Sequence, residues 1–337
     1  MKHINIPIFI PHLGCPNQCV FCNQRHISGK EIFDENSVEK SIYNVLTSIK
    51  DEECEIAFFG GSFTGIDRGL MIRLLDVAQK FVDEKKICGI RMSTRPDYIS
   101  QEIIDILKKY SITCVELGIQ TTNNDVLNVL KRGHSLDDTI QAINLLKKAN
   151  INFVGQMMIG LPAATIEDEL ECANFISSNN AFGARIYPTL VLRNTELENM
   201  YQRGDYLPLS VEKAVERSAE VLKVFIKNKI SCIRIGLCDS ENLHSENTFV
   251  AGPNSPSIGE MVKSRVYYDL ISEKLSSFKK TLNTIVIECP KGKMSQVIGI
   301  KKENILKFKK QFYIEKLKIK ENNVLTEFTV NVFEEEE

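Results

Sequence analysis

Hydrophobic residues follow two alternating patterns over residues 6–191. Short apolar runs predict buried strands, and apolar positions three and four residues apart predict amphipathic helices. The expected strands are Ile6–Pro11, Glu55–Phe59, Ile87–Met92, Thr113–Leu117, Phe153–Ile159 and Ala184–Val191. The expected helices are Asp34–Lys50, Ile66–Val82, Gln101–Lys109, Asn124–Lys131, Leu136–Lys148 and Ile166–Ser178. A strand followed by a helix, repeated with short connections, predicts an α/β fold with a parallel sheet and outer helices.

Polar or glycine-rich segments lie at the ends of several of these strands. Gly60–Ser62 follows the second strand, and Arg95 follows the third. On the fourth strand, Glu116 and Gln120 are expected to face the interior rather than solvent. Because the carboxyl ends of parallel strands meet at one edge, where ligands bind, we expect these residues to surround one site.

The first strand leads into a loop with three cysteines at the spacing C-x3-C-x2-C, namely Cys15, Cys19 and Cys22. Gly14 and Pro16 favour a tight loop in which three thiolates can converge on one metal or cluster. One alternative is a zinc site, although zinc usually takes four protein ligands. Another is a disulfide with a spare thiol. Three thiolates would leave one iron of a [4Fe–4S] cluster open for a cofactor or substrate.

The length and composition of the chain indicate its domain organisation, its location and the state of its cysteines. The 337 residues exceed what one hydrophobic core usually supports, so a large domain with a small appendage is expected. Met1 leads directly into the first strand, leaving no room for a signal peptide, and no apolar run reaches membrane-spanning length. We therefore expect a cytoplasmic protein without a membrane segment.

In a reducing compartment its ten cysteines are thiols or cluster ligands rather than disulfides. Cys238 is expected to be a loop residue.

The cysteine loop resembles the signature of the radical S-adenosylmethionine (radical SAM) superfamily, in which an aromatic residue precedes the last cysteine. That residue is Phe21 here, and it is expected to contact the cofactor. The resemblance implies that SAM chelates the open iron and is split into methionine and a 5′-deoxyadenosyl radical. It also implies a partial barrel of six βα units. A complete eight-unit barrel is the alternative if the later strand Cys232–Gly236 and another element close it.

The resemblance also assigns expected roles to the strand-end motifs. Gly60 and Gly61 would bind the SAM amino group, whereas Ser62 stands where many relatives have Glu. Arg95 with its neighbour Asp97, Gln120 and Arg132 would contact the carboxylate or ribose of SAM. The alternatives are a plain strand-to-helix turn at Gly60–Ser62 and a surface ion pair at Arg95. His134 is expected to be a loop residue.

Five strings resemble one branch of the superfamily, the radical SAM domain of the Elongator catalytic subunit, which acts on the wobble uridine of tRNA. They are STRPDYI, VELGIQ with KRGHS, MMIGLP, YPTLVLRNTELE and GDYLP, and the resemblance covers about residues 5–215. Two features differ. The first two cysteines are much closer together here, and an acetyltransferase domain is not expected, because the residues after about 215 are too few for one. Acetyl-CoA-dependent carboxymethylation is therefore not implied.

The remaining chain predicts a lid loop with a connecting helix at 236–278, after the barrel at 1–235, and a small basic α+β module at 279–337 with an acidic tail at Glu334–Glu337. Twelve lysines and three glutamates occur between 279 and 320. In the module we expect a strand at Thr284–Glu288, helices at 295–299 and 304–312, and strands near 314–319 and 325–332.

This module resembles a K-homology fold, whose G-x-x-G loop clamps nucleic acid. The lysines expected at nucleic acid are Lys291, Lys293, Lys301 and Lys302. Lys302 stands at the position of the second glycine. An unrelated basic packing module is the alternative.

Three functions are consistent with these features. The first is a radical SAM enzyme that modifies RNA, with a tRNA base as substrate and a flavodoxin or ferredoxin type of electron donor. The second is a radical SAM enzyme for a small molecule, similar to oxygen-independent coproporphyrinogen III oxidase. The third is a non-catalytic iron–sulfur protein. Salt-sensitive binding of tRNA would favour the first over the second, and absence of 5′-deoxyadenosine would favour the third.

Overall fold

The computed structural model describes residues 3–10, 13–15, 19–23, 33–49, 53–237, 247–278 and 284–335. Its larger unit is a seven-stranded parallel sheet with the order β1-β2-β3-β4-β5-β6-β8. The strands are β1 (His3–Phe9), β2 (Glu53–Phe59), β3 (Gly89–Thr94), β4 (Ile112–Gln120), β5 (Asn152–Ile159), β6 (Gly183–Pro188) and β8 (Ser231–Ile235). No pairing between β1 and β8 closes the sheet in the described chain, so the partial barrel is confirmed and the complete one is not formed.

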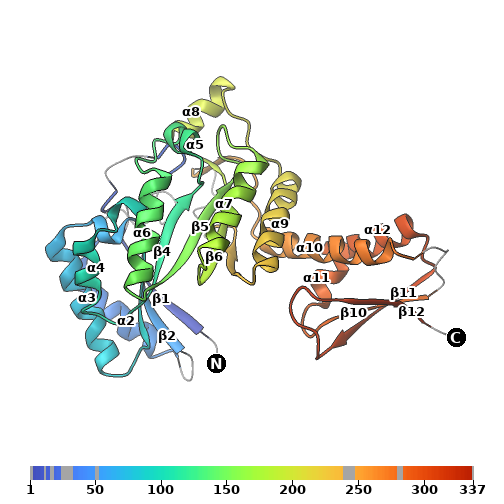
Figure 1. Ribbon diagram of the computed structural model, residues 1–337, viewed down its shortest axis with the longest axis horizontal. Coiled ribbons are helices and arrows are strands. Elements are labelled where there is room, and N and C mark those ends of the chain that lie inside the picture. Colours follow the sequence, from blue (N-terminus) through green and yellow to red (C-terminus); the bar gives the residue numbers. More distant parts are fainter. Residues whose placement is uncertain are drawn as a thin grey trace.

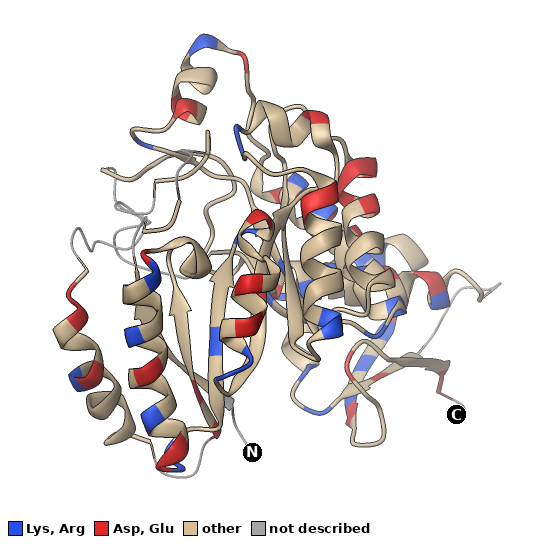
Figure 2. Cartoon of the chain, turned by 60° about the vertical axis from the view of Figure 1, so that its left-hand side comes forward, with Lys and Arg blue, Asp and Glu red and all other residues tan. Residues whose placement is uncertain are grey.

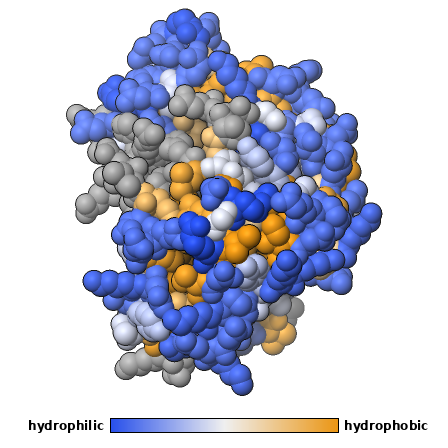
Figure 3. Space-filling model, turned by 90° about the vertical axis from the view of Figure 1, so that its left-hand side faces the viewer, coloured by the Kyte–Doolittle hydropathy of each residue, from blue (hydrophilic) through white to orange (hydrophobic). Residues whose placement is uncertain are grey.

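Helices cover the outer face of this curled sheet (Figure 1). They are α2 (Val38–Leu46), α3 (Arg68–Asp83), α4 (Gln101–Leu107), α5 (Asn124–Val129), α6 (Leu136–Lys148), α7 (Ile166–Ser178) and α9 (Val211–Lys227). Short 3₁₀ turns are η1 (Glu35–Ser37), η2 (Phe63–Gly65) and η3 (Pro96–Tyr98). The helices expose charges of both signs (Figure 2). Figure 3 shows the face of the molecule that lies on the left-hand side of Figure 1. This face is mostly hydrophilic, with hydrophobic side chains visible between the polar ones.

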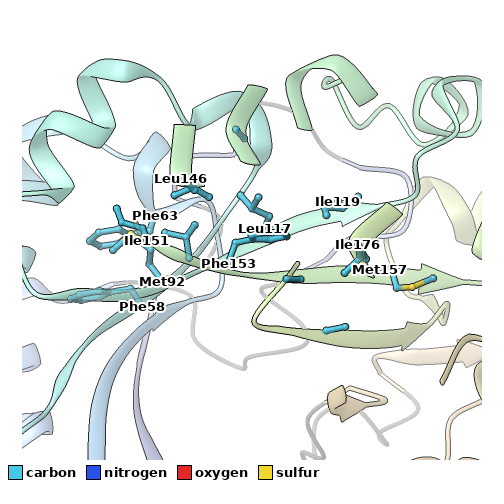
Figure 4. Packing of buried hydrophobic residues seen from close by; sticks show 14 of the residues in the cluster. Phe58, Phe63, Met92, Leu117, Ile119, Leu146, Ile151, Phe153, Met157 and Ile176 are labelled. Carbon is cyan, nitrogen blue, oxygen red and sulfur yellow. The ribbon is translucent and has the colours of Figure 1, made fainter. Parts of the chain in front are cut away.

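Side chains alternate along the strands between the helices and the concave face of the sheet. On β4, Val115, Leu117 and Ile119 pack in the main hydrophobic core. The same core holds Phe58, Met92 and Phe153 from neighbouring strands and Leu146 from α6, as Figure 4 shows. Because side chains on a strand alternate, Glu116 and Gln120 turn to the concave face, and both are buried as expected.

The expected continuous strand Ala184–Val191 is wrong. β6 ends at Pro188, which has no N–H to continue the ladder. The chain then forms β7 (Val191–Leu192), which pairs antiparallel with β9 (Phe249–Ala251). Helix α8 (Glu196–Arg203), which was not expected, begins after Thr195, whose hydroxyl caps it, and ends at Gly204 in the left-handed region with φ +79°.

The C-terminal module has its own sheet, with the order β11-β10-β12. Its elements are α10 (Ile258–Leu275), β10 (Thr284–Pro290), α11 (Met294–Ile298), η4 (Ile300–Lys302), α12 (Glu303–Phe312), β11 (Lys316–Asn322) and β12 (Asn331–Glu334). The last strand starts later than the expected 325–332. Helix α10 joins the two units, because Val262 and Val266 pack in the core of the larger unit while Tyr267 and Ile271 pack in that of the module.

Some predictions lie wholly or partly outside the described residues. They are the state of Cys238, much of the expected lid loop and the last two residues of the acidic tail. None of the helices in the described ranges is both long and apolar enough to span a membrane.

A buried ionic network crosses the concave face. The Glu116 carboxylate accepts hydrogen bonds from Arg91 on β3 at 3.2 Å, Arg185 on β6 at 2.8 Å and Gln156 on β5 at 2.8 Å. Arg91 also donates to Glu55 on β2 at 2.9 Å. Both glutamates and both arginines are buried, so the network ties five strands together away from solvent.

We expect Glu116→Ala to reduce the free energy of unfolding by about 3–5 kcal/mol, because it leaves two buried guanidinium groups short of a carboxylate. Urea unfolding of the full chain followed by circular dichroism measures this loss. Glu102→Ala is the control, because the Glu102 side chain is 69% exposed in its ion pair with Arg68. This control should change stability by no more than about 0.5 kcal/mol. Equal losses in the two variants would contradict the importance of the network.

Candidate cofactor site

The three signature cysteines lie just beyond β1, at the carboxyl edge of the sheet. None of the three forms a disulfide; Cys19 is buried, and Cys15 and Cys22 are half-buried. The Cys22 amide donates to the Cys19 carbonyl at 3.0 Å, which makes a tight turn around Val20 and Phe21. Within the described ranges, which omit residues 16–18, no three His, Cys, Asp or Glu side chains are arranged to hold a metal ion. The roles of the cysteines as cluster ligands therefore stay predictions.

The turn Gly60–Ser62 packs directly against the cysteine loop. The Ser62 amide donates to the Leu13 carbonyl at 3.2 Å, and the Ser62 hydroxyl lies 3.3 Å from the Cys15 sulfur. A Cβ on Gly61 would stand 2.4 Å from that Leu13 oxygen, so only glycine permits this approach. The turn thus positions the cysteine loop, and its contact with SAM stays a prediction.

Arg95 is buried rather than on the surface. Its guanidinium donates twice to the Asp97 carboxylate, at 2.9 and 2.8 Å, while its Nη1 has no hydrogen-bond partner. Burial alone would lower the pKa of Arg95, but Asp97 and the nearby Cys19 and Cys15 raise it overall. Arg95 therefore stays charged, with one donor to spare beside the cysteines.

Gln120 and Arg132 meet at the end of β4. A register shift between Gly118 and Gln120 marks a bulge, and Gln120 has φ +68° with an unpartnered, buried Oε1. The Arg132 guanidinium donates to the Gly118 carbonyl at 3.0 Å and to the Cys19 sulfur at 3.3 Å. The structure thus brings Arg132, from the loop after α5, beside both the end of β4 and Cys19, while the roles of Gln120 and Arg132 at SAM stay predictions.

Phe21 packs between two apolar clusters above the sheet. One cluster contains Val20, Leu130 and Met158 and the other contains Leu197 and Tyr206. This packing fixes the cysteine turn against α5 and α8. A contact between Phe21 and SAM stays a prediction.

His134 lies in the loop between α5 and α6, as expected, but it is buried there. Burial, together with the neighbouring charges of Arg132 and Arg95, lowers the pKa of His134 to about 3. Neither ring nitrogen makes a hydrogen bond of standard geometry, although the Ile119 backbone is close by. His134 is therefore neutral near neutral pH. Its place in the string KRGHS is the only sequence feature that connects His134 with the site, because one histidine in a loop has no distinctive pattern.

The four lysines predicted to contact nucleic acid all lie in the C-terminal module. Lys301 and Lys302 are exposed between α11 and α12, with φ values of +51° and +64°, and Lys291 and Lys293 lie near the end of β10. Lys293 forms an ion pair with Glu327 at 2.6 Å. The four lysines therefore lie in two turns of the module, of which only the turn with Lys301 and Lys302 exposes two adjacent lysines, and their contact with nucleic acid stays a prediction.

The residues around the cysteines fit the group that the signature implies. Three cysteine thiols supply the donor set of an iron–sulfur cluster. Beside them, Arg95 Nη1, Arg132 Nε and Gln120 Oε1 are buried and unpartnered. Such atoms are costly unless a ligand pairs with them, and two donors with one acceptor suit a carboxylate and a hydroxyl or amino group. A zwitterionic nucleoside such as SAM has these groups.

Two family models match the chain. The model described as "Radical SAM superfamily" matches residues 9–176, and the model described as "Radical_SAM C-terminal domain" matches residues 182–268. Together they cover well over half of the chain. The chain therefore belongs to the radical SAM superfamily, and it is an enzyme of the class that uses a [4Fe–4S] cluster and SAM.

Within this class, the chain is similar to the Elongator catalytic subunit and related proteins. The tRNA uridine(34) acetyltransferase of Methanocaldococcus infernus is 38% identical over 147 residues, which are 42% of this chain and 28% of that protein. An uncharacterised protein of Methanocaldococcus jannaschii is 28% identical over 66% of this chain and 72% of that protein. The structure of M. infernus Elp3 with an N-terminal deletion matches with a TM-score of 0.63 and 25% identity, over 81% of this chain and 63% of that one. The chain thus spans less than a third of the acetyltransferase.

His134 should make the stability of the apo-protein depend on pH. Its folded pKa of about 3 lies below the ordinary 6.5, so only the unfolded chain binds this proton between those values and stability falls as pH falls below about 6.5. When the pH is lowered from about 7 to about 4.5, we expect the free energy of unfolding to fall by about 2–3 kcal/mol more in the parent than in His134→Gln. Urea unfolding at both pH values tests this. Identical losses would show that His134 is not buried in its neutral form.

Proposed function

We propose that this protein cleaves SAM reductively and uses the resulting 5′-deoxyadenosyl radical to modify RNA, with a tRNA base as its substrate. The observation that carries the proposal is the meeting of the cysteine loop with the unpartnered polar atoms of Arg95, Gln120 and Arg132. The similarity to tRNA uridine(34) acetyltransferases supports the choice of substrate. Acetyl transfer is not proposed.

The bound cluster and SAM supply the electron and the radical for hydrogen abstraction. Cys15, Cys19 and Cys22 would hold the cluster, and Gly60, Gly61 and Ser62 would face the amino group of SAM. Arg95 would donate its free Nη1 to the SAM carboxylate. The concave face beneath is already filled by paired charges, so it would exclude water rather than bind substrate.

The remaining polar residues of the site would orient the nucleoside. Gln120 Oε1 would accept from a ribose hydroxyl, and the Nε of Arg132 would donate to a polar group of SAM. Phe21 would pack against the cofactor from the cysteine turn.

The basic loop of the C-terminal module supports an RNA substrate. Lys301 and Lys302 are exposed and have no carboxylate within 4.0 Å in the described chain, so their charges are available to phosphates. Beneath them the buried Asn304 amide donates to Ser264 Oγ at 3.0 Å and to the Val297 carbonyl at 3.2 Å. The module would therefore present a rigid loop to tRNA, with Lys291 and Lys293 nearby. We further propose a cytoplasmic setting and a flavodoxin or ferredoxin type of electron donor.

We expect Cys19→Ala to abolish the absorbance of the reconstituted cluster and the formation of 5′-deoxyadenosine, because two thiolates cannot hold the cluster. Anaerobic reconstitution, iron and sulfide analysis, and chromatography after incubation with dithionite and SAM measure both losses. Cys88→Ala is the matched control, because the exposed Cys88 is outside the site, and it should keep both properties. SAM cleavage by Cys19→Ala would contradict the assignment.

The double variant Lys301→Gln/Lys302→Gln should bind tRNA more weakly. Each lost phosphate contact should reduce the slope of log affinity against log salt by about 0.7–0.9. Filter binding across a salt series measures both effects. Lys80→Gln/Lys213→Gln removes the same charge from ion-paired lysines on α3 and α9 and should bind like the parent. A parent protein that cleaves SAM but binds no tRNA would favour a small-molecule substrate.

A further inference from the structure

Four arginines are buried among the described residues, namely Arg91, Arg95, Arg132 and Arg185. Three of them pair with carboxylates: Arg91 with Glu55 and Glu116, Arg95 with Asp97, and Arg185 with Glu116. Arg132 is 8% exposed and has no carboxylate within 4.0 Å in the part of the chain that the structure describes. A buried guanidinium without a counter-charge is costly, so this site requires a negative group beside Arg132.

The group that Arg132 faces is the sulfur of Cys19. Arg132 Nη1 donates to Cys19 Sγ at 3.3 Å, and Nη2 donates to the Gly118 carbonyl at 3.0 Å. A neutral thiol gives the guanidinium no counter-charge. A cysteine thiolate on an iron–sulfur cluster gives one, because the charge is shared over the cluster and its ligands.

The chain holds Arg132 rigidly in this position. Its own amide donates to the Leu127 carbonyl at 3.0 Å, and the Val20 amide of the cysteine loop donates to the Leu130 carbonyl at 3.1 Å. A Cβ on Gly118 would lie 2.6 Å from Arg132 Nη2, so glycine at the β4 bulge makes room for the guanidinium. The donor and the cysteine loop are thus fixed to the same helix end.

We propose that Arg132 is the counter-charge and N–H···S donor of the cluster at Cys19, and that it raises the reduction potential of the cluster. This inference rests on the proposed function. It differs from the expectation that the guanidinium mainly grips the SAM carboxylate. A positive charge and a hydrogen bond at a ligand sulfur stabilise the reduced, more negative cluster more than the oxidised one. Arg132 is therefore a tuning residue for the one-electron step by which the external donor reduces the cluster.

The test compares reconstituted parent, Arg132→Gln and Lys131→Gln in redox titrations with dithionite, without SAM, followed by electron paramagnetic resonance. At the potential where half of the parent cluster is reduced, the ratio of reduced to oxidised cluster should be at least tenfold lower in Arg132→Gln. This equals about 59 mV for one electron. Lys131→Gln removes the same charge from an exposed neighbour and should titrate like the parent.

An unchanged ratio in Arg132→Gln, with weakened SAM binding, would overturn the inference and return Arg132 to the SAM carboxylate. If the variant holds no cluster, pulsed electron paramagnetic resonance of the parent holoenzyme labelled with ¹⁵N-arginine tests the inference instead. Coupling of the reduced cluster to an arginine nitrogen that persists in Arg95→Gln supports the inference, and absence of coupling, or its loss in Arg95→Gln, overturns it. A parent protein that cannot assemble a cluster would contradict the proposed function instead, so the two failures are distinguishable.

Discussion

The Glu116 carboxylate is the interaction on which the concave face of the sheet depends. A sheet that curls over itself brings the inward side chains of distant strands together, and on β2, β3, β4 and β6 several of these are charged. Glu116 meets Arg91 and Arg185 from opposite sides. Their removal from water is costly, and only their mutual pairing offsets it. The curl and the pairing therefore require each other.

This filled interior confines the chemistry to the carboxyl edge. The strand ends carry glycines, a bulge and left-handed residues, which allow the backbone to turn where the cysteine loop approaches. At Gly61 and Gly118 a Cβ would collide with the Leu13 carbonyl or with Arg132. The same residues that interrupt regular structure thus position the cysteine loop, and the unpartnered donors lie where the ladders end.

The order of strands and helices could be predicted because each buried strand is a compact apolar run and each outer helix has one apolar face. The placement of Gly60–Ser62, Arg95 and Gln120 at one edge of the sheet follows from the same topology, whereas Arg132 reaches that edge from the loop after α5. The partners of Arg91 and Arg185 could not be predicted, because they depend on register and curl, which no local pattern specifies. Helix α8 and the pair β7 and β9 were missed because they are short and their apolar positions are few.

Charge balance distinguishes the two sides of the site. On the concave face each buried guanidinium has a carboxylate supplied by the chain itself, so its charge is balanced there. At the edge, Arg95 has one partner and one free donor, and Arg132 has a sulfur instead of a carboxylate. A fold stabilised only by its own contacts would not keep such groups buried. The unbalanced positive charge of Arg132 is therefore explained by an anionic group that binds beside Cys19.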